Sequence, residues 1–344
     1  MNKLTIFFSG IFFLTACTVK TNEKETITII DSSLDEVIKI PVIFDTDANN
    51  ELDDQHALAY LLFSGAVFDV KGITVNATYN GGDIQGHYDE AERIMKLCGV
   101  SGKIPLLKGA NGSFEEIRDS LASLAYDGSD AVEFIIQEAR KQQGQKLVLL
   151  PVGKLTNIAL ALQKAPDIKK MVRIVWLGSN YPEPGEYNQE NDIPSLNYIL
   201  DQDVQFEMVM VRYGKTSGSD AVRVTPAMIN EKMPGAGPGD ATITGRHGGE
   251  FTNFGDYSIN LFRHIDLHGD PPSRALFDMV AVAIVKNSDW GEMKEIPAPI
   301  LEDSRWHERP SNNRKIFVWE NFNKGLILDD FFETMQNPAI AIPD

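Results

Sequence analysis

Residues 40–56 read IPVIFDTDANNELDDQH, a short apolar run that leads directly into a cluster of acidic side chains. The run Ile40–Phe44 predicts a buried strand, because so short an uninterrupted apolar segment fits a strand covered on both faces. The apolar spacing in Leu52–Phe63 predicts a helix. Unsatisfied N–H groups at a helix N-terminus favour one or two carboxylates nearby. Five acidic residues within this stretch need a further counter-charge: Asp45, Asp47, Glu51, Asp53 and Asp54.

This acidic cluster predicts a divalent metal site, because packed carboxylates repel one another and hard oxygen ligands select Ca²⁺ or Mg²⁺. The stretch does not match an EF-hand, which needs alternating acids, a central glycine and a closing glutamate. A solvated acidic loop is one alternative interpretation. A haloacid-dehalogenase-type phosphatase is another, since it also begins with strand-Asp-x-Asp. However, Asn49 departs from that motif and leaves the pair Asp53-Asp54 unexplained.

Beyond this stretch, short apolar runs alternate with amphipathic segments, and no linker divides the chain. Repeated strand–helix units with short connections predict an α/β fold, with a mostly parallel central sheet flanked by helices on both faces. In such sheets ligands bind beyond the carboxyl ends of the strands, here after Phe44, Val75, Val152 and Leu177. The predicted strands are 70–75, 146–152 and 171–177, and the predicted helices are 83–97, 155–163 and 204–211.

The segment Gly214–Gly249 is rich in glycine and proline and has little apolar periodicity. We therefore expect it to lie outside the core. Two interpretations remain open: a mobile lid over the predicted site, or a surface insertion without a function.

The composition limits the kinds of partner. Acidic residues number 49 and basic residues 32 among 344, which gives a formal charge of −17. Because so negative a chain repels phosphate backbones, we expect no nucleic acid partner. The two cysteines, Cys17 and Cys98, are too few for a disulfide framework or a thiolate zinc site.

Residues 1–16 predict an export signal, with Lys3 ahead of a short apolar run. Leu14-Thr15-Ala16-Cys17 resembles a bacterial lipobox, in which the cysteine is lipidated; a plain secretory signal is the alternative. We therefore expect residues 1–16 to be a lipoprotein signal peptide, Cys17 the lipidation site, residues 17–37 a tether and residues 38–344 the functional domain. The mature protein would be exported and anchored to a membrane of the bacterial cell envelope.

The acidic stretch also resembles the signature of the inosine-uridine preferring nucleoside hydrolases, which is Asp-x-Asp-Pro-Gly-x-Asp-Asp after the first strand. Asp45, Asp47 and the pair Asp53-Asp54 match its two ends, whereas five residues, Ala48–Leu52, replace the usual three. Further matches follow in the family's order, a combination that unrelated chains rarely reproduce. These matches are Gly72–Val75 with Asn80, Val152–Leu160, Trp176–Gly178, Asn197 and Phe277–Val282.

The resemblance implies a single-domain nucleoside-hydrolase-like fold and a calcium-dependent hydrolase that splits a nucleoside or related N-riboside into base and ribose. It implies that Asp47 accepts a proton from the attacking water. Calcium would be held by the carboxylates of Asp47, Asp54 and Asp278 and by the backbone carbonyl of Val152. Members are commonly homodimers or homotetramers, but no stretch of this sequence identifies an interface. The residues implied in substrate binding are Asp53, Asn80, Leu177, Asn197, Phe277 and Asp278.

The sequence departs from the family at two site positions. Ser195 stands where the family has a glutamate before the asparagine matched by Asn197, and Phe277 stands where inosine-cleaving members have a histidine that serves the leaving base. A general acid contributes about 10²–10⁴-fold in rate, so its loss favours an alternative, a non-catalytic nucleoside-binding lipoprotein. Candidate replacements for the acid are His56 and His87, and candidate rings for stacking on a base are Tyr79 and Trp176.

Overall fold

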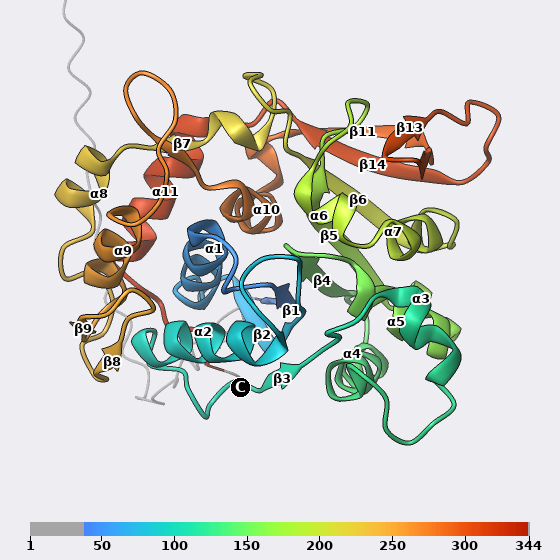
Figure 1. Ribbon diagram of the computed structural model, residues 1–344, viewed down its shortest axis with the longest axis horizontal. Coiled ribbons are helices and arrows are strands. Elements are labelled where there is room, and N and C mark those ends of the chain that lie inside the picture. Colours follow the sequence, from blue (N-terminus) through green and yellow to red (C-terminus); the bar gives the residue numbers. More distant parts are fainter. Residues whose placement is uncertain (1–37, 343–344) are drawn as a thin grey trace, which may run out of the picture. The chain divides into compact units, whose positions relative to one another are not determined.

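Eight strands form the central sheet of the computed structural model, which describes residues 38–342 (Figure 1). They are β1 (Ile40–Thr46), β2 (Phe68–Val75), β3 (Leu106–Lys108), β4 (Leu147–Pro151), β5 (Val172–Ser179), β6 (Gln205–Met210), β11 (Glu292–Pro297) and β14 (Lys315–Glu320). Their order is β11-β14-β6-β5-β4-β1-β2-β3, and every neighbouring pair is parallel except β11 with β14. The predicted, mostly parallel sheet is confirmed, and the carboxyl ends of β1, β4 and β5 share one edge.

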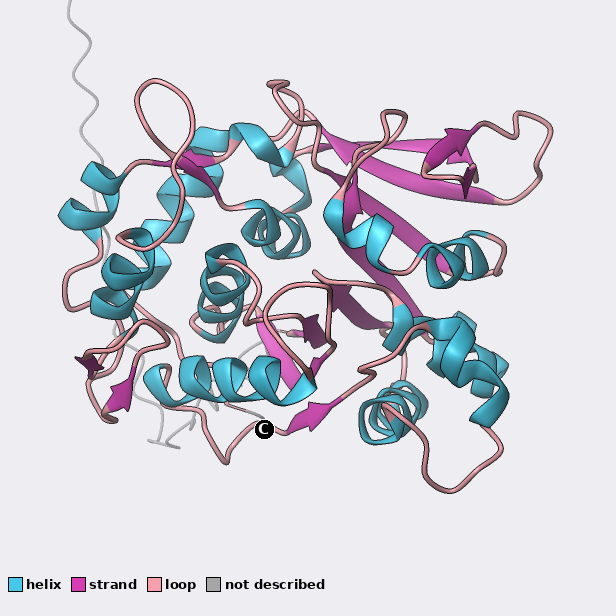
Figure 2. Ribbon diagram, in the orientation of Figure 1, coloured by secondary structure: helices cyan, strands magenta, loops and turns pink. Residues whose placement is uncertain are grey.

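Helices cover both faces of this sheet (Figure 2). They are α1 (Leu52–Leu62), α2 (Ile84–Leu97), α3 (Phe114–Ile117), α4 (Ser129–Lys141), α5 (Thr156–Lys164), α6 (Tyr187–Asn191), α7 (Ile193–Leu200), α8 (Pro226–Lys232), α9 (Phe254–Phe262), α10 (Phe277–Lys286) and α11 (Lys324–Gln336). One apolar core lies between the sheet and α1, α2, α9, α10 and α11, and a second lies beneath α4, α5 and α7. Within residues 38–342, no helix has both the length and the apolar character needed to span a bilayer.

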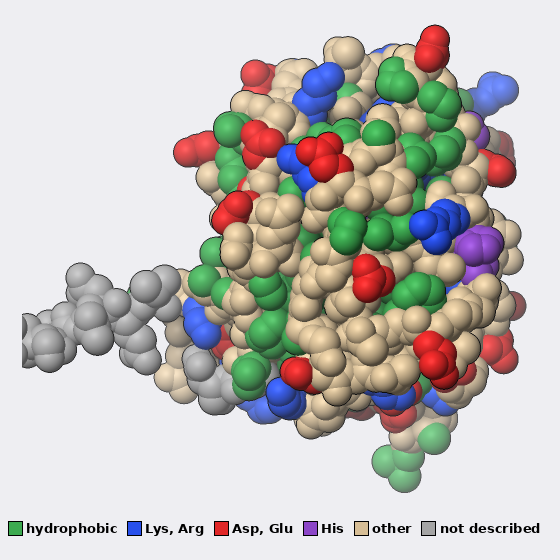
Figure 3. Space-filling view, turned by 90° about the vertical axis from the view of Figure 1, so that its left-hand side faces the viewer, with side chains coloured by type: hydrophobic (Ala, Val, Ile, Leu, Met, Phe, Trp, Pro, Cys, Tyr) green, Lys and Arg blue, Asp and Glu red, His purple; other side chains and the backbone are tan. Residues whose placement is uncertain are grey.

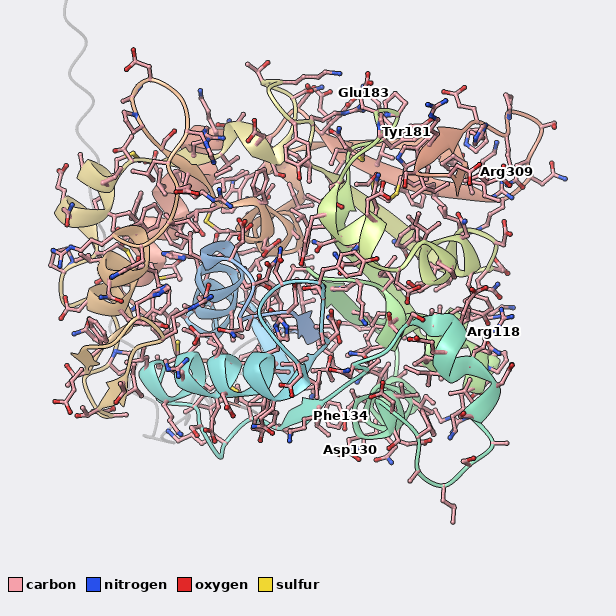
Figure 4. All side chains as sticks on the ribbon, viewed as in Figure 1. Arg118, Asp130, Phe134, Tyr181, Glu183 and Arg309 are labelled. Atoms are coloured by element: carbon pink, nitrogen blue, oxygen red, sulfur yellow. The ribbon has the colours of Figure 1, made fainter. Side chains whose placement is uncertain are left out.

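Close packing of α4 on the sheet depends on a glycine in β2. A Cβ atom at Gly72 would lie 2.5 Å from the ring of Phe134, which is labelled in α4 in Figure 4. A larger residue would therefore push the helix away from the sheet. This glycine belongs to the Gly72–Val75 segment that resembles the nucleoside hydrolases.

The predicted strands and helices are confirmed, with small shifts at their ends and one exception. The expectation of a helix over 204–211 is wrong, because Gln205–Met210 form β6 between β5 and β14. A short, continuous apolar run fits a buried strand as well as a helix segment, and periodicity does not separate the two. The length of six residues is that of a strand.

The glycine-rich segment 214–249 contributes to the core, contrary to expectation. It contains α8 and the short strands β7 (Arg223–Val224) and β8 (Ile243–Thr244). Val222, Ile229 and Met233 are buried in the same core as α1 and α9. Ile229 and Met233 are four residues apart in and just after α8, but this helix is short and is flanked by glycine-rich and proline-rich chain, which hides its apolar spacing in the sequence. Figure 3 shows this side of the molecule, where acidic, basic and apolar side chains are interspersed on the surface.

His56 is a core residue rather than a replacement catalytic acid. Its Nδ1 lies 2.5 Å from the carbonyl oxygen of Leu52, and its Nε2 lies 2.7 Å from Ser258 Oγ in α9. The rings of Phe254 and Phe262 meet it edge-on. Both nitrogens are thereby used inside the core, and burial lowers the pKa of His56 to about 4.

This burial predicts a pH dependence of stability. When the pH is lowered from 7 to 5, the unfolded chain gains a proton on His56 while the folded chain does not. The contribution of His56 to the free energy of unfolding therefore decreases by about 2 kcal/mol over this range. His56→Gln retains one donor and one acceptor but cannot titrate. We expect the difference in unfolding free energy between wild type and His56→Gln, measured by urea denaturation, to shrink by that amount from pH 7 to pH 5. A difference that stays constant over this range would contradict the assignment.

Candidate active site

A cavity of about 480 Å³ lies at the carboxyl ends of β1, β4 and β5. Its floor consists of buried acidic side chains and backbone, and its rim includes the exposed residues Asn80 and Tyr213. The parallel topology predicts a ligand site at this edge of the sheet. The sequence-predicted site residues that line the cavity are Asp47, Asp53, Asp54, Asn80, Val152, Leu177, Phe277 and Asp278.

Two helix N-termini bring carboxylates together on the floor. Asp53 and Asp54 lie in the first turn of α1, and Asp278 lies in the first turn of α10. The two helices pack against each other, and the backbone N–H groups of Phe277 and Asp278 donate hydrogen bonds to the Asp53 carboxylate. N–H groups at helix N-termini favour negative charge, so this arrangement supports three acidic side chains at one point.

One carboxylate oxygen from each of Asp53, Asp54 and Asp278 lies within 4.8 Å of the other two, and all three side chains are buried. Burial and mutual repulsion raise the pKa of Asp54 and Asp278 well above the ordinary value, and burial raises the pKa of Asp53 to about 7. Asp47 lies beside this trio and shares a hydrogen bond with Asp54. Oxygen donors that carry this much negative charge fit a hard divalent cation.

Hydrogen bonds hold the loop that carries Asp47. Thr78 Oγ1 donates to Asp47 Oδ2 at 2.5 Å. Below it, the Asp45 carboxylate accepts hydrogen bonds from Thr74 Oγ1 at 2.6 Å, Asn76 Nδ2 at 2.7 Å and Asn157 Nδ2 at 2.6 Å. Burial raises the pKa of Asp45 to about 6. Asp45 therefore joins the ends of β1 and β2 to the start of α5 and fixes the direction in which the acidic loop leaves the sheet.

The loop after β4 approaches the acidic cluster closely. A Cβ atom at Gly153 would lie 2.7 Å from Asp47 Oδ1, so a larger residue fits only if the carboxylate moves. The preceding residue, Val152, lines the cavity. Its carbonyl oxygen accepts a hydrogen bond of 2.7 Å from Asn188 Nδ2, which also donates to the carbonyl of Leu177 at 3.2 Å.

Glu186 and Asn188 are cavity residues that the sequence interpretation missed. Both are buried, and burial raises the pKa of Glu186 to about 7. They lie where the chain leaves β5 and enters α6. The stretch Glu186-Tyr187-Asn188 has the Glu-aromatic-Asn order of the family's Glu-Phe-Asn motif, and this order is the signal that could have identified them.

Asn197 does not reach the cavity, which corrects the prediction that it binds substrate. It lies in α7, where its Nδ2 donates to the carbonyl of Leu301 at 2.7 Å and its Oδ1 accepts from the Leu301 N–H at 3.0 Å. Ser195 is buried at the start of the same helix, where Asp192 caps it. Ser195 is therefore not a replacement for the glutamate of the family's Glu-Phe-Asn motif, because Glu186 provides a glutamate in the cavity lining.

The other proposed aromatic and histidine substitutes also lie elsewhere. His87 is buried, and its Nδ1 accepts the Asn49 N–H at 3.2 Å. Trp176 is a core residue that donates to the Gly153 carbonyl and stacks on Phe206. His56, His87, Tyr79 and Trp176 are all outside the cavity lining, whereas Phe277 lies in it, in edge contact with Tyr213.

The expanded loop Ala48–Leu52 adds polar groups to the cavity without moving Asp53 away from it. Asn50 and Glu51 line the cavity, and Glu51 forms an ion pair with Arg274. Asn49 turns away from the cavity and donates to the Gly81 carbonyl at 2.6 Å. The chain thus keeps the family's acidic positions and gains a contact between this loop and the segment before α10.

Comparisons with known proteins find similar chains among the nucleoside hydrolases. The non-specific ribonucleoside hydrolase RihC of Klebsiella pneumoniae subsp. pneumoniae is 24% identical over 172 residues, which are 44% of this chain and 54% of that protein. The match thus spans about half the length of this relative. A plant nucleoside hydrolase structure superposes with a TM-score of 0.67 at 17% identity and covers 88% of this chain and 100% of its own. The inosine-uridine preferring nucleoside hydrolase of Bacillus anthracis gives 0.62 at 16% identity, with coverages of 87% and 99%.

At these identities the two solved structures show the fold alone, and they confirm the predicted α/β architecture. The family model described as inosine-uridine preferring nucleoside hydrolase matches residues 42–320, which contain every acidic residue of the cavity floor. The family's members are hydrolases that act on N-glycosyl bonds, the enzyme class predicted from the sequence. Because the model covers most of the chain, this protein belongs to the inosine-uridine preferring nucleoside hydrolase family.

Proposed function

We propose that this protein uses calcium to hydrolyse the N-glycosidic bond of a nucleoside or related N-riboside, releasing base and ribose. The observation that carries this proposal is the convergence of Asp53, Asp54 and Asp278 on the cavity floor, with Asp47 beside them. Bond cleavage passes through an oxocarbenium-like sugar, which carries positive charge. Buried carboxylates around the sugar stabilise that charge.

The donor set fits calcium. It contains only oxygen atoms, from the carboxylates of Asp47, Asp54 and Asp278 and the carbonyl of Val152, and Ca²⁺ accepts such mixed oxygen sets in a less regular geometry than Mg²⁺. When bound, the ion would orient the attacking water and lower its pKa. Asp53 belongs to the same trio and is close enough to contribute to either the metal or the sugar.

The chain's own residues supply the remaining roles. Asp47, held by Thr78, accepts a proton from the attacking water. Fixing the ribose hydroxyls places C1′ against that water and favours a flattened sugar ring. The groups available for these hydroxyls are Asp53, Asn80, Glu186, Asn188 and Asp278, while Leu177 lines the floor and Phe277 offers a ring to the base.

A second candidate function is capture of nucleosides without cleavage. The observation that favours it is Phe277, because a phenyl ring has no proton to give to a leaving base. The intact acidic floor favours the hydrolase, since a binding protein has no need for so many repelling carboxylates.

The location of the enzyme is a separate proposal. We infer from the lipobox-like Leu14–Cys17 that the chain is an exported lipoprotein held to a bacterial envelope membrane through Cys17. The signal peptide, Cys17 and the tether all lie outside the described residues 38–342. Residues 38–344 would then act on nucleosides outside the cytoplasm.

Hydrolysis is tested with a panel of purine and pyrimidine nucleosides in Ca²⁺, with assays for free base and reducing sugar. We expect wild type to release both and Asp47→Asn to lower kcat by about 10²–10⁴-fold, because the proton acceptor is lost. Wild-type binding without product would support capture instead. An Asp47→Asn variant that cleaves at the normal rate would exclude Asp47 as the base.

A matched pair of asparagine variants controls this test. Asn188→Ala removes a cavity side chain, so we expect weaker nucleoside binding or slower cleavage. Asn197→Ala removes a side-chain amide that lies outside the cavity and, among residues 38–342, bonds to the backbone of Leu301, so we expect normal kinetics. Normal kinetics in Asn188→Ala together with a loss in Asn197→Ala would instead identify Asn197 as the substrate-binding residue.

Metal binding is tested by thermal unfolding with and without Ca²⁺. At a concentration 100 times Kd, the ion adds about 2.7 kcal/mol to stability, which should raise Tm by several degrees. Asp54→Asn should lose this rise, and without metal it should be at least as stable as wild type, because one repelling carboxylate is gone. A rise with Mg²⁺ but none with Ca²⁺ would contradict the choice of ion.

The anchor is tested in cells that express the full chain. Radioactive palmitate should label the wild-type protein, and Cys17→Ala should lose the label and leave the membrane fraction. Equal labelling of both proteins would exclude Cys17 as the lipidation site.

A further inference from the structure

One wall of the cavity is formed by a pair of short strands, and each strand contributes an arginine to it. β7 (Arg223–Val224) pairs with β10 (Arg274–Ala275) in antiparallel register, with Arg274 opposite Val224 and Ala275 opposite Arg223. Both arginines line the cavity. Each arginine is paired with an acidic residue that also lines the cavity, Arg223 with Asp220 and Arg274 with Glu51, so this wall adds guanidinium N–H donors to a cavity whose floor is acidic.

The two arginines differ in how their N–H groups are used. Arg223 donates to Asp220 Oδ1 at 2.7 Å and to Ser273 Oγ at 3.0 Å. Arg274 forms its ion pair with Glu51, but its Nε is buried and has no hydrogen-bond partner among the described residues. The Arg274 side chain is 11% exposed. A buried N–H without an acceptor is unfavourable, and because Arg274 lines the cavity its free donor is available to a ligand atom there.

The proposed reaction needs such a donor. When the C1′–N bond breaks, its electron pair stays on the base nitrogen, while the water oxygen bonds to C1′ and Asp47 takes the water's proton. The base then leaves with negative charge and gains a proton from solvent. Phe277 cannot neutralise that charge, and His56 and His87 lie outside the cavity. A guanidinium group keeps its charge at all relevant pH values, so it stabilises an anion by hydrogen bonding without giving up a proton.

We propose that Arg274 contacts the departing base and stabilises its negative charge, and that Glu51 of the expanded loop is a positioning residue that holds Arg274 in place. This inference rests on the proposed hydrolase function. Phe277 and Tyr213, in edge contact with centroids 5.9 Å apart, supply the neighbouring aromatic surface for the base. The longer loop after β1 supplies Glu51, the carboxylate that holds Arg274. This loop would thereby compensate for the phenylalanine at position 277, where inosine-cleaving members have a histidine.

The test compares two substrates that differ in their leaving group. One is the nucleoside that wild type cleaves fastest, and the other is 4-nitrophenyl β-D-ribofuranoside, whose phenolate leaves readily as an anion. We expect Arg274→Met to lower kcat on the nucleoside by about 10²–10³-fold, as for loss of one charge-stabilising donor. Its kcat on the nitrophenyl riboside should change by less than roughly threefold. Retained activity on that substrate also shows that the variant is folded.

Equal losses on both substrates, or no loss on either, would overturn the role of Arg274. If wild type cleaves neither substrate, the proposed hydrolase function fails, and that outcome is distinct from failure of this inference. Arg274→Lys is the second variant, in case methionine disturbs the β7–β10 pair; it keeps the charge but presents fewer donors, so a smaller selective loss is expected. His268, an exposed residue at the rim, is the competing donor. A selective loss in His268→Gln with none in Arg274→Met would overturn the proposal.

Two further variants separate positioning from general damage. Glu51→Gln should reproduce part of the selective loss on the nucleoside, because the arginine loses its charged partner. Equal effects of Glu51→Gln on both substrates would overturn the positioning role. Arg314→Met is the matched control, since Arg314 is also partly buried with an unpartnered Nε but bonds to the carbonyls of Lys315 and Val204, outside this cavity. It should leave both rates unchanged.

Discussion

Carboxylates buried as closely as Asp53, Asp54 and Asp278 repel one another, and the surrounding structure offsets that repulsion with directed hydrogen-bond donors. Thr46 Oγ1 donates a hydrogen bond to Asp54 at 2.6 Å, and the N-terminal N–H groups of α10 donate hydrogen bonds to Asp53. These bonds reduce the unfavourable energy without removing it, as the raised pKa values of Asp54 and Asp278 show. The site is therefore held in a state that a divalent cation stabilises further.

The fold makes this arrangement possible by joining elements that are far apart in the sequence. β1 delivers the acidic loop to the sheet edge, and α10, more than two hundred residues later, delivers Asp278 to the same point. The contact between α1 and α10 sets the distance between their N-termini. Asp45 fixes the other side, because its hydrogen bonds to Thr74, Asn76 and Asn157 join β1, β2 and α5.

Local features of the sequence predicted much of the fold and the acidic floor, because an apolar strand followed by carboxylates at a helix start is encoded within 17 residues. The helix expected at 204–211 failed because its apolar run is equally compatible with a buried strand. Asn197 is wrong as a substrate-binding residue because the length of the loop after β5, which decides the asparagine that reaches the cavity, follows no periodic rule. The Glu51–Arg274 ion pair could not be predicted at all, since nothing in either segment specifies a partner at that separation.

The distribution of charge in the cavity matches the charge that the proposed reaction creates. As the glycosidic bond breaks, the sugar becomes positive beside Asp47, Asp53 and Asp278, and the base becomes negative beside Arg274. Both groups of charges are fixed by helix N-termini, a strand pair and an ion pair before the substrate arrives, so little reorganisation is needed during the reaction. In this arrangement proton donation to the base is one way of stabilising the leaving group, and a permanently charged donor held by the expanded loop is another. The phenylalanine at position 277 is compatible with the proposed reaction, because Arg274 of β10 would stabilise the leaving group by charge and hydrogen bonding rather than by proton transfer.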